Sequence, residues 1–544
     1  MNMKKMLSFT TLLLAVVTAV VAQPKRTTGA IFNPETTAKT PQKIALSFRS
    51  LRGLPSSFSL EQYCPTPGDQ GNHGTCVAFA NGYGLATILY ARTHDLTDKA
   101  LIDKYAFSAS YLYEQIKDPA DKDCQNGSDP INALVTMIKT GDALQSTVPY
   151  QCNANMSDAA KAEAANYKIQ DATILFAAKG FLNDDKYVKE PDEMISVTKK
   201  ALLEGSPVST GFYLPESFFH ITTDVWYTKE GDEKSDWKHS GHAMTIVGYD
   251  DNKAGGAFRV LNSWGTGWAD KGFIWIRYND YTRWCVEALQ AFADPYTPVP
   301  AEKHHDDPKP EPKPDPKPEP DPKPQPEPEP KPVPENNTMS LSGSIEFKLN
   351  SGDDMPVNKI SSRNLVVEEE SAGKEDLVAY TMMNSYTSGT KFRFYMNIDN
   401  EAYIYAFATD LTGKINRILP YDDLTSTHVG GNSIIAFPSD TKVIKMDENK
   451  GTDYLLILYS KTPLNMNEMM ADMNKTKGGL SKKIIAALGD KLIAKDKIKY
   501  DPKKAGFQVN VTMGSRNLTV ADDDENKEVA SGTVVPLMIE IKHD

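Results

Sequence analysis

The chain has 544 residues and a formal net charge of −12, and its lysines and arginines form no basic block. Without such a block the protein has little with which to neutralise phosphates, so nucleic acid is not an expected partner. The length predicts two or three domains. No apolar run of about 18 residues follows the N-terminal one, so we expect no transmembrane segment.

The first residues have the pattern of an export signal. A basic start is followed by an apolar run over residues 6–21, and Val20 and Ala22 supply small side chains where a signal peptidase cuts. Residues 1–22 are therefore predicted to be a signal peptide. No cysteine lies near that point, which speaks against a lipid anchor. We expect an exported protein that is periplasmic, at the outer surface or secreted.

An exported chain meets conditions in which disulfides form, so its five cysteines are candidates for disulfide pairing. They are Cys64, Cys76, Cys124, Cys152 and Cys285. The odd number leaves one thiol unpaired within the chain, and the other four allow three pairings. The order of the cysteines in the sequence does not choose among these pairings.

The stretch DQGNHGTCVAFA, residues 69–80, changes from turn-forming to apolar residues at Cys76. The apolar residues that follow recur with a helical period, although Leu85 is out of phase, and Gly82 and Gly84 suggest close packing against another element. Cys76 is therefore predicted at a helix N-terminus, where unpaired N–H groups lower the pKa of a thiol. This stretch alone supports a nucleophile and a buried or bridged cysteine equally.

A nucleophile needs a base and a group that orients the base. His242 begins GHAMTIVGYD, which is typical of a buried strand that would hold the histidine by its backbone. Downstream, FRVLNSWGTGWADKGFIWIRY predicts strand, turn and strand. Asn262 ends the first of these strands, and Trp264 and Trp268 can cover it. A neutral amide shielded by indole fixes the tautomer of an imidazole without adding charge.

Together, DQGNHGTCVAFA, GHAMTIVGYD and LNSWGTGW resemble the papain-type cysteine peptidases, in that family's order of Cys, His and Asn. The resemblance implies an α+β, two-lobe fold over residues 54–297, with one helical and one β-barrel-like lobe. The family places its His and Asn about 130–150 residues beyond the Cys. Here His242 and Asn262 lie 166 and 186 residues beyond Cys76, so loop insertions must account for the excess.

The resemblance also implies a role for each residue. Cys76 would be the nucleophile, His242 its general base and acid, and Asn262 the residue that orients the imidazole. Gln70 would donate its amide to the oxyanion together with the Cys76 backbone N–H, and one good donor there is worth roughly 3–4 kcal/mol. The implied activity is that of an endopeptidase that hydrolyses protein or peptide substrates through a thioester acyl-enzyme, with no metal or cofactor.

Residues that would contact the substrate follow from the same resemblance, because backbone in this family pairs with the substrate chain. They are Asn126, Gly127, Ser128, Gly74, Ala243 and Trp268, with Trp264 in support. Trp268 is expected to flank the leaving-group side. Ser128 replaces a glycine, which predicts a narrower pocket.

Two departures concern the cysteines and the region before Cys76. His73 stands where the family usually has a disulfide cysteine, and we expect it to be a solvent-facing turn residue. Cys124 and Cys152 resemble a pair that the family bridges, and this leaves Cys64 to pair with Cys285.

Residues 23–53 are expected to be a short pro-segment or extension, about one third as long as the family's inhibitory pro-domain. No helical pattern is visible, and TTGAIFNPETTAKTPQ is typical of extended or disordered chain. A short peptide lying in the active site and the absence of autoinhibition are both open.

Residues 298–337 alternate proline with lysine and acidic residues. Proline at nearly every second position forbids a helix, so this is predicted to be a polyproline-II linker of roughly 100 Å at about 3.1 Å per residue.

Residues 338–544 are predicted to form a mainly β domain. Period-two strands fill GTKFRFYMNIDNEAYIYAF, DYLLILYS is typical of a buried strand, and VVPLMIEIKHD is expected at an edge. NMNEMMADMNKTKGGLSKKIIAALGDKLI predicts two short helices, whose methionines are expected in the core. The region resembles an uncharacterised β-rich bacterial domain that is appended to exported proteins. We expect it to bind a cell surface or another protein.

Other functions are open at this point. A narrow-specificity cell-wall peptide hydrolase or transamidase is the enzymatic alternative. A transglutaminase normally has Asp as its third residue, so Asn262 argues against it. A non-catalytic surface adhesion protein built on a peptidase fold is disfavoured because all four catalytic-type residues are present.

Overall fold

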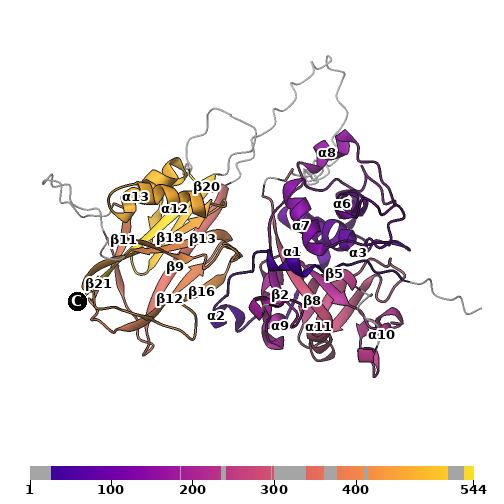
Figure 1. The fold of residues 1–544 in the computed structure, drawn as a ribbon, viewed down its shortest axis with the longest axis horizontal. Helices are drawn as coiled ribbons and strands as arrows, with labels where there is room; N and C mark the ends of the chain where they lie inside the picture. The colour runs from indigo at the N-terminus through magenta and orange to yellow at the C-terminus, as the bar shows by residue number, and fades with distance from the viewer. Residues whose placement is uncertain are drawn as a thin grey trace, which may run out of the picture.

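A computed structural model of the chain describes residues 26–183, 185–234, 241–295, 297–298, 338–360, 376–409, 414–512 and 532–544. These residues form two parts that lie side by side (Figure 1), one before and one after the predicted linker. The predicted signal peptide and most of the predicted linker lie outside the described residues. No described helix is long and apolar enough to cross a membrane, and no described cluster of His, Cys, Asp or Glu could hold a metal ion.

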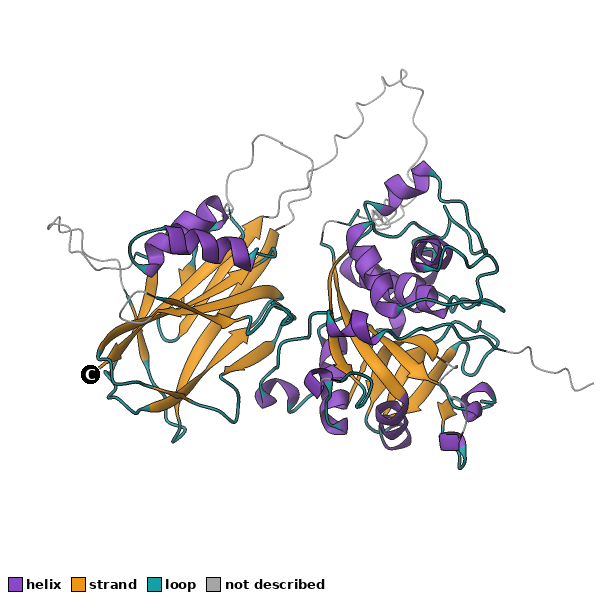
Figure 2. Cartoon of the chain, in the orientation of Figure 1, coloured by secondary structure: helices purple, strands orange, loops and turns teal. Residues whose placement is uncertain are grey.

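A layer of helices makes up one lobe of the first part (Figure 2). The layer contains α3 (Cys76–Ala78), η2 (Phe79–Ala86), α4 (Thr87–Thr93), α5 (Lys99–Lys104), α6 (Ala109–Ile116), α7 (Pro130–Lys139) and α8 (Asp158–Ala164). The segments α3, η2 and α4 follow one another without a break, and η2 is a π-helix. A π turn changes the phase of the side chains, which explains why Leu85 is out of the α-helical period.

The glycines of η2 let this helix approach its neighbours, as the sequence predicts. A Cβ on Gly84 would lie 2.7 Å from Thr245 Oγ1, and one on Gly82 would lie 2.5 Å from Asp142 Oδ2. The helix that begins at Cys76 therefore packs directly on the sheet.

The second lobe is built on a mainly antiparallel sheet, in which β4 pairs in parallel with β7. Its strands are β1 (Ser57–Ser59), β2 (Ile169–Ala177), β3 (Val208–Tyr213), β4 (Val225–Trp226), β5 (Gly241–Asp250), β6 (Ala257–Leu261), β7 (Phe273–Arg277) and β8 (Cys285–Ala293). Their order is β2-β8-β3-β5-β6-β7-β4, with β1 beside β5. Helices α9 (Pro191–Leu203), α10 (Glu216–Phe219) and α11 (Tyr278–Trp284) contribute to a core separate from the one shared with the helical lobe. The α+β, two-lobe fold is confirmed.

The residues before this fold contain two short helices, so the absence of helix expected there is wrong. Helix α1 spans Pro34–Ala38 and α2 spans Phe48–Leu51. Asn33 and Ser47 cap them by accepting hydrogen bonds from backbone N–H groups, and a proline opens α1. We call residues 26–51 the strap.

The described residues after the linker form two sheets, two α-helices and two short 3-10 helices. Its strands are β9 (Thr338–Leu349), β10 (Val357–Lys359), β11 (Val378–Met382), β12 (Lys391–Ile398), β13 (Ala402–Thr409), β14 (Ile415–Leu419), β15 (His428–Val429), β16 (Ser433–Phe437), β17 (Ile444–Lys445), β18 (Gly451–Ser460), β19 (Lys499–Tyr500), β20 (Ala505–Thr512) and β21 (Val534–His543). One sheet has the order β10-β11-β21-β18-β13-β14, with β15 on β13, and the other has β16-β12-β9-β20-β19, with β17 on β12.

Helices α12 (Met466–Lys475) and α13 (Leu480–Leu488) are the two that the sequence predicts. Met469 and Met473 lie in the core that these helices form with strands of the first sheet, so the methionines are core residues. The expected edge position of β21 is wrong. This strand lies between β11 and β18 because most of its side chains are buried and both of its backbone edges find partners.

Candidate active site

Cys76 is the first residue of α3, as predicted, and its side chain is fully buried. The turn before it, residues 68–70, is held against the end of β6 because Gln70 N–H donates to the Ser263 carbonyl (2.9 Å) and Gly265 N–H donates to the Gly68 carbonyl (2.9 Å). The start of the helix and the strands of the other lobe therefore meet at Cys76.

The structure brings together His242 on β5 and Asn262, which directly follows the neighbouring strand β6. His242 Nε2 lies 2.8 Å from Asn262 Oδ1, which also accepts the Ser263 N–H at 2.8 Å. Because an amide oxygen only accepts, Nε2 must carry the proton, and Nδ1 keeps a lone pair. Within the described part of the chain, Nδ1 has no hydrogen-bond partner. The Trp264 ring lies 4.9 Å from the imidazole and covers it.

Burial controls the ionisation of both reactive groups in this arrangement. It raises the pKa of Cys76 to about 12, against the opposing effect of backbone groups that include those of Ala243 and Gly29. Burial also lowers the pKa of His242 to about 4, although the bond to Asn262 favours the charged form. The thiol and the imidazole are thus both neutral here. The thiolate predicted from the helix N-terminus is not favoured in this state because desolvation outweighs that field.

Gln70 lies at the site, but its amide is already engaged. Nε2 donates to the His73 carbonyl at 2.7 Å, and Oε1 accepts from Ser263 Oγ at 2.6 Å. A second carbonyl, that of Thr27, lies 3.4 Å from Nε2. Thr27 belongs to the strap, so the donor predicted for the oxyanion faces a carbonyl oxygen of the protein's own chain.

Residues 26–32 of the strap, which we call its site end, run across Cys76. Gly29 and Ala30 donate their N–H groups to the Gly241 carbonyl (2.9 and 2.8 Å). Ser128 N–H donates to the Gly29 carbonyl, and Ile31 N–H donates to the Ser128 carbonyl, both at 2.9 Å. The strap therefore occupies the backbone positions that were predicted to hold substrate. A Cβ on Gly29 would lie 2.1 Å from the Gly74 oxygen, so only glycine fits there.

Two segments of the chain match known protein families. Residues 54–293 match the family described as papain family cysteine protease, and residues 385–463 match a domain of unknown function, DUF4384. Residues 54–293 form a papain-family cysteine protease domain. The chain is thus a hydrolase of the cysteine peptidase class.

The relatives are distant. Cysteine proteinase 3 of Entamoeba histolytica is 24% identical over 239 residues, which are 44% of this chain and 68% of the relative. A cathepsin L-like protein of Caenorhabditis elegans is 32% identical over 120 residues, which are 22% of this chain and 34% of the relative. Among solved structures, xylellain, a cysteine protease from Xylella fastidiosa, has 21% identity and a TM-score of 0.39, covering 51% of this chain and 99% of its own.

At one side of Cys76 in the papain-family domain, Trp264 contacts the strap. Its Nε1 donates to the Thr27 carbonyl (3.2 Å), and its own carbonyl accepts from Arg26 Nη1 (3.0 Å). Trp268, the tryptophan predicted for this place, is buried beside the ring of Trp264, with centroids 5.1 Å apart. Both tryptophans belong to the same turn, and Trp264 is the one that is hydrogen-bonded to the strap.

At the other side of Cys76, Phe32 of the strap packs against the papain-family sheet. Its ring lies 5.2 Å from that of Tyr213 and rests on Gly211, where a Cβ would lie 2.1 Å from the phenyl ring. Glu287 faces Gly211 across β3 and β8 and is buried. Burial, with a smaller effect of Asp129, raises the pKa of Glu287 to about 8.

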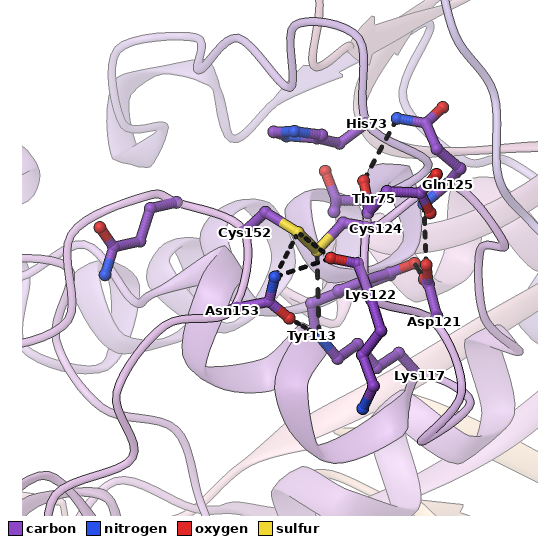
Figure 3. The surroundings of a disulfide bond; sticks show 12 residues. His73, Thr75, Tyr113, Lys117, Asp121, Lys122, Cys124, Gln125, Cys152 and Asn153 are labelled. Carbon is purple, nitrogen blue, oxygen red and sulfur yellow. Dashed lines mark hydrogen bonds between the residues drawn. A yellow bond between two sulfur atoms is a disulfide. The ribbon is translucent and has the colours of Figure 1, made fainter.

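The predicted Cys124–Cys152 disulfide is present (Figure 3) and lies close to the start of α3. It joins the loop before Asn126, Gly127 and Ser128 to the stretch that follows Tyr150. Cys124 also accepts the Gly74 N–H at its carbonyl (2.7 Å), so the bridge supports both walls of the strap's path.

The predicted Cys64–Cys285 bridge is wrong. In the described structure both residues are buried thiols, and neither is bonded to another cysteine. Cys64 Sγ lies 3.7 Å from the Leu60 carbonyl and Cys285 Sγ lies 3.3 Å from the Glu287 carbonyl, so each thiol has a local backbone partner. Both behave as small apolar residues of the core.

Tyr150 is a site residue that the sequence reading missed. Its hydroxyl lies 2.8 Å from Thr75 Oγ1, 3.1 Å from His73 Nδ1 and 2.8 Å from the Gln70 carbonyl, and so ties together the turn before Cys76. His73 is therefore half-buried and bonded, not solvent-facing as expected. The nearby cysteine in TVPYQC was the only signal that could have pointed to Tyr150.

Proposed function

We propose that the protein is an exported cysteine endopeptidase that the strap keeps inactive. The observation that carries the proposal is the His242–Asn262 pair, with its unpartnered Nδ1, beside a helix that starts at Cys76. Export is supported by the pattern of residues 1–22 and by the Cys124–Cys152 disulfide, since disulfides persist in oxidising compartments.

The reaction uses these groups once the strap has left. His242 Nδ1 takes the proton of the Cys76 thiol, and the sulfur attacks the carbonyl carbon of the peptide bond. The oxyanion is stabilised by the Cys76 N–H and Gln70 Nε2, which no longer faces Thr27. The imidazolium gives its proton to the leaving amine, and a thioester remains on the sulfur. Water, deprotonated by His242, then releases the acid and the free thiol.

The substrate class follows from what the strap displaces. An extended peptide can pair with the Ser128 backbone and the Gly241 carbonyl, as the site end does. The place of Phe32 on Gly211 and Tyr213 suits an apolar side chain of that peptide. We therefore propose proteins or peptides with an apolar residue near the cleaved bond as substrates.

The test is to expel the site end by one substitution in the full chain. Gly29→Val adds atoms where a Cβ already meets the Gly74 oxygen, and overpacking of this kind costs about 1–3 kcal/mol. Alkylation of Cys76 by iodoacetamide, located by peptide mass spectrometry, should be about 10- to 100-fold faster, and a fluorogenic peptide should be hydrolysed.

Two controls frame this experiment. Ile31→Val, at a side chain that is 50% exposed, should leave the alkylation rate unchanged. Adding Cys76→Ala to Gly29→Val should abolish hydrolysis. If Gly29→Val makes Cys76 reactive while a broad set of peptides and denatured proteins stays intact, the protein is not an endopeptidase.

A further inference from the structure

The strap does not end at the active site. Beyond α1 it passes between the papain-family domain and the C-terminal part. Gln42 pairs in parallel with Ile174 of β2, an outer strand of the papain-family sheet, and also with Thr425 of the C-terminal part. One segment of the strap is thus hydrogen-bonded to both parts of the chain.

Residues 42–50, which we call the anchor end, are bound in detail by the C-terminal part. Ser47 N–H donates to the Ile434 carbonyl, and Ile434 N–H donates to Ser50 Oγ, both at 2.7 Å. Asp440 accepts two bonds with its carboxylate, from Ser47 Oγ (2.8 Å) and from the Phe48 N–H (2.7 Å). Helix α2 lies between the two parts, beside β16 (Figure 1).

Arg49 adds a further contact of the anchor end with the C-terminal part. Its guanidinium lies 3.7 Å from the centre of the Tyr395 ring, and Nη1 lies 3.2 Å from Glu346 Oε2. The ion pair is exposed and weak by itself, whereas the stacking fixes the direction of the side chain.

A buried cluster of side chains joins the strap, the papain-family domain and the C-terminal part. Lys43 of the strap lies 2.6 Å from Glu204 of the papain-family domain, and both side chains are almost wholly buried. Ser433 of the C-terminal part donates to the same carboxylate at 3.1 Å, and Lys200 donates to the Gly431 carbonyl at 3.1 Å. The interface between the two parts is therefore built around the strap.

We propose that the C-terminal domain has the function of anchoring the strap, and that its hold on residues 42–50 keeps residues 26–32 on the active site. This inference rests on the inhibitory role of the strap proposed above. The site end is a short stretch held mainly by backbone hydrogen bonds, each of which contributes little net stability. An anchor that begins at residue 42 of the same chain raises the local concentration of the site end at the active site. Loss of the anchor therefore lowers the occupancy of the active site by the strap.

The experiment removes the anchor contacts from the full chain without touching the active site. Asp440→Ala deletes both carboxylate bonds to the strap, and bonds to a charged group are worth more than neutral ones. Iodoacetamide should alkylate Cys76 roughly tenfold faster than in the wild type. Hydrogen exchange followed by mass spectrometry should be faster at residues 26–32 as well as at residues 42–50.

The matched control is Asp354→Ala. This carboxylate is on the same domain and pairs with Lys348, and its side chain is 75% exposed. This substitution should change neither the alkylation rate of Cys76 nor hydrogen exchange at residues 26–32 and 42–50. Arg49→Ala repeats the test from the strap's own side, so the inference remains open to refutation if Asp440→Ala does not fold.

The inference is overturned if exchange rises at residues 42–50 while residues 26–32 and Cys76 keep their wild-type rates. Peptide hydrolysis is not the readout, so the two proposals fail separately. A chain that shows the coupling but cleaves no peptide contradicts only the proposed activity.

Discussion

The two ends of the strap are bound in different ways. At the site end, Gly29, Ala30 and Ile31 are held through backbone groups, against Gly241 and Ser128. At the anchor end, charged side chains take part, with Asp440 and Glu204 receiving bonds from the strap. Backbone pairing is what any extended peptide offers, so the site end is replaceable by substrate. The contacts of the anchor end depend on particular side chains, so they determine where the strap binds.

The largest expected effect is at the anchor end, in Lys43→Met. Removing the lysine leaves the buried Glu204 with Lys200, 3.6 Å away, as its cationic partner among the described residues. Breaking a buried pair costs about 3–5 kcal/mol. Urea unfolding should show a loss of this size, together with faster exchange at residues 42–50. The control is Lys161→Met, whose pair with Asp158 is exposed, and it should change stability by less than about 1 kcal/mol. Equal losses in both variants would contradict the importance of the cluster.

The next effect, of at most about 4 kcal/mol between pH 5 and 8, is expected from Glu287 beside the site end. Burial raises the pKa of this carboxyl to about 8, so the folded state favours the protonated form. Its contribution is fully present below the unfolded pKa of about 4.5 and is lost as the pH rises to about 8. Thermal unfolding of the wild type should therefore show declining stability from pH 5 to 8.

Glu287→Gln should flatten this part of the stability profile, because the amide does not titrate. Thr37 Oγ1 of the strap donates to Glu287 at 3.2 Å and can donate equally well to an amide oxygen. A profile in Glu287→Gln as steep as that of the wild type would show that another group titrates.

The smallest effect, of about 1 kcal/mol or less, is expected from His428 in the interface. Its ring stacks between Phe292 and Tyr403, with Asp171 at 3.4 Å and Glu401 at 3.2 Å. The two carboxylates raise the pKa of His428 despite its burial.

The raised pKa of His428 determines how its contribution to stability changes with pH. Stability from His428 is fully present below the unfolded pKa of about 6.5 and is lost as the pH rises through the higher folded value. Nearby, Lys461 Nζ donates to the Glu401 carbonyl, and burial lowers the pKa of this lysine. Exchange at residues 42–50, corrected for the intrinsic pH dependence, should rise across neutral pH in the wild type and less in His428→Gln. An identical rise in both proteins would show that His428 does not cause the pH dependence of exchange.

The sequence predicts where the candidate reactive residues lie in their elements, because each stands in a contiguous motif. Cys76, His242 and Asn262 follow from local patterns of turn, helix and strand, and the structure brings His242 and Asn262 together. Which tryptophan contacts the strap, Trp264 or Trp268, could not be predicted from the sequence, because the two share one turn. The pairing of Cys64 and Cys285 depends on distances that only the fold sets.

The path of the strap was beyond prediction for a physical reason. Its site end is bound largely through peptide groups, which every residue carries. The side chains that take part, those of Arg26, Thr27 and Phe32, contact backbone carbonyls or apolar surface, so RTTGAIF carries no distinctive motif. The position of β21 did leave a signal. Its apolar run VVPLMI is typical of a strand covered on both faces, and such a strand belongs inside a sheet.

The orientation of Gly29 has a last consequence. Its N–H donates to the Gly241 carbonyl, its own carbonyl accepts the Ser128 N–H, and no side chain fits between it and Gly74. Because the strap belongs to the same chain as the active site, dilution does not release it. Under the proposed function, activation therefore requires an outside event, either a second protease that cuts the strap or a force that pulls the two domains apart.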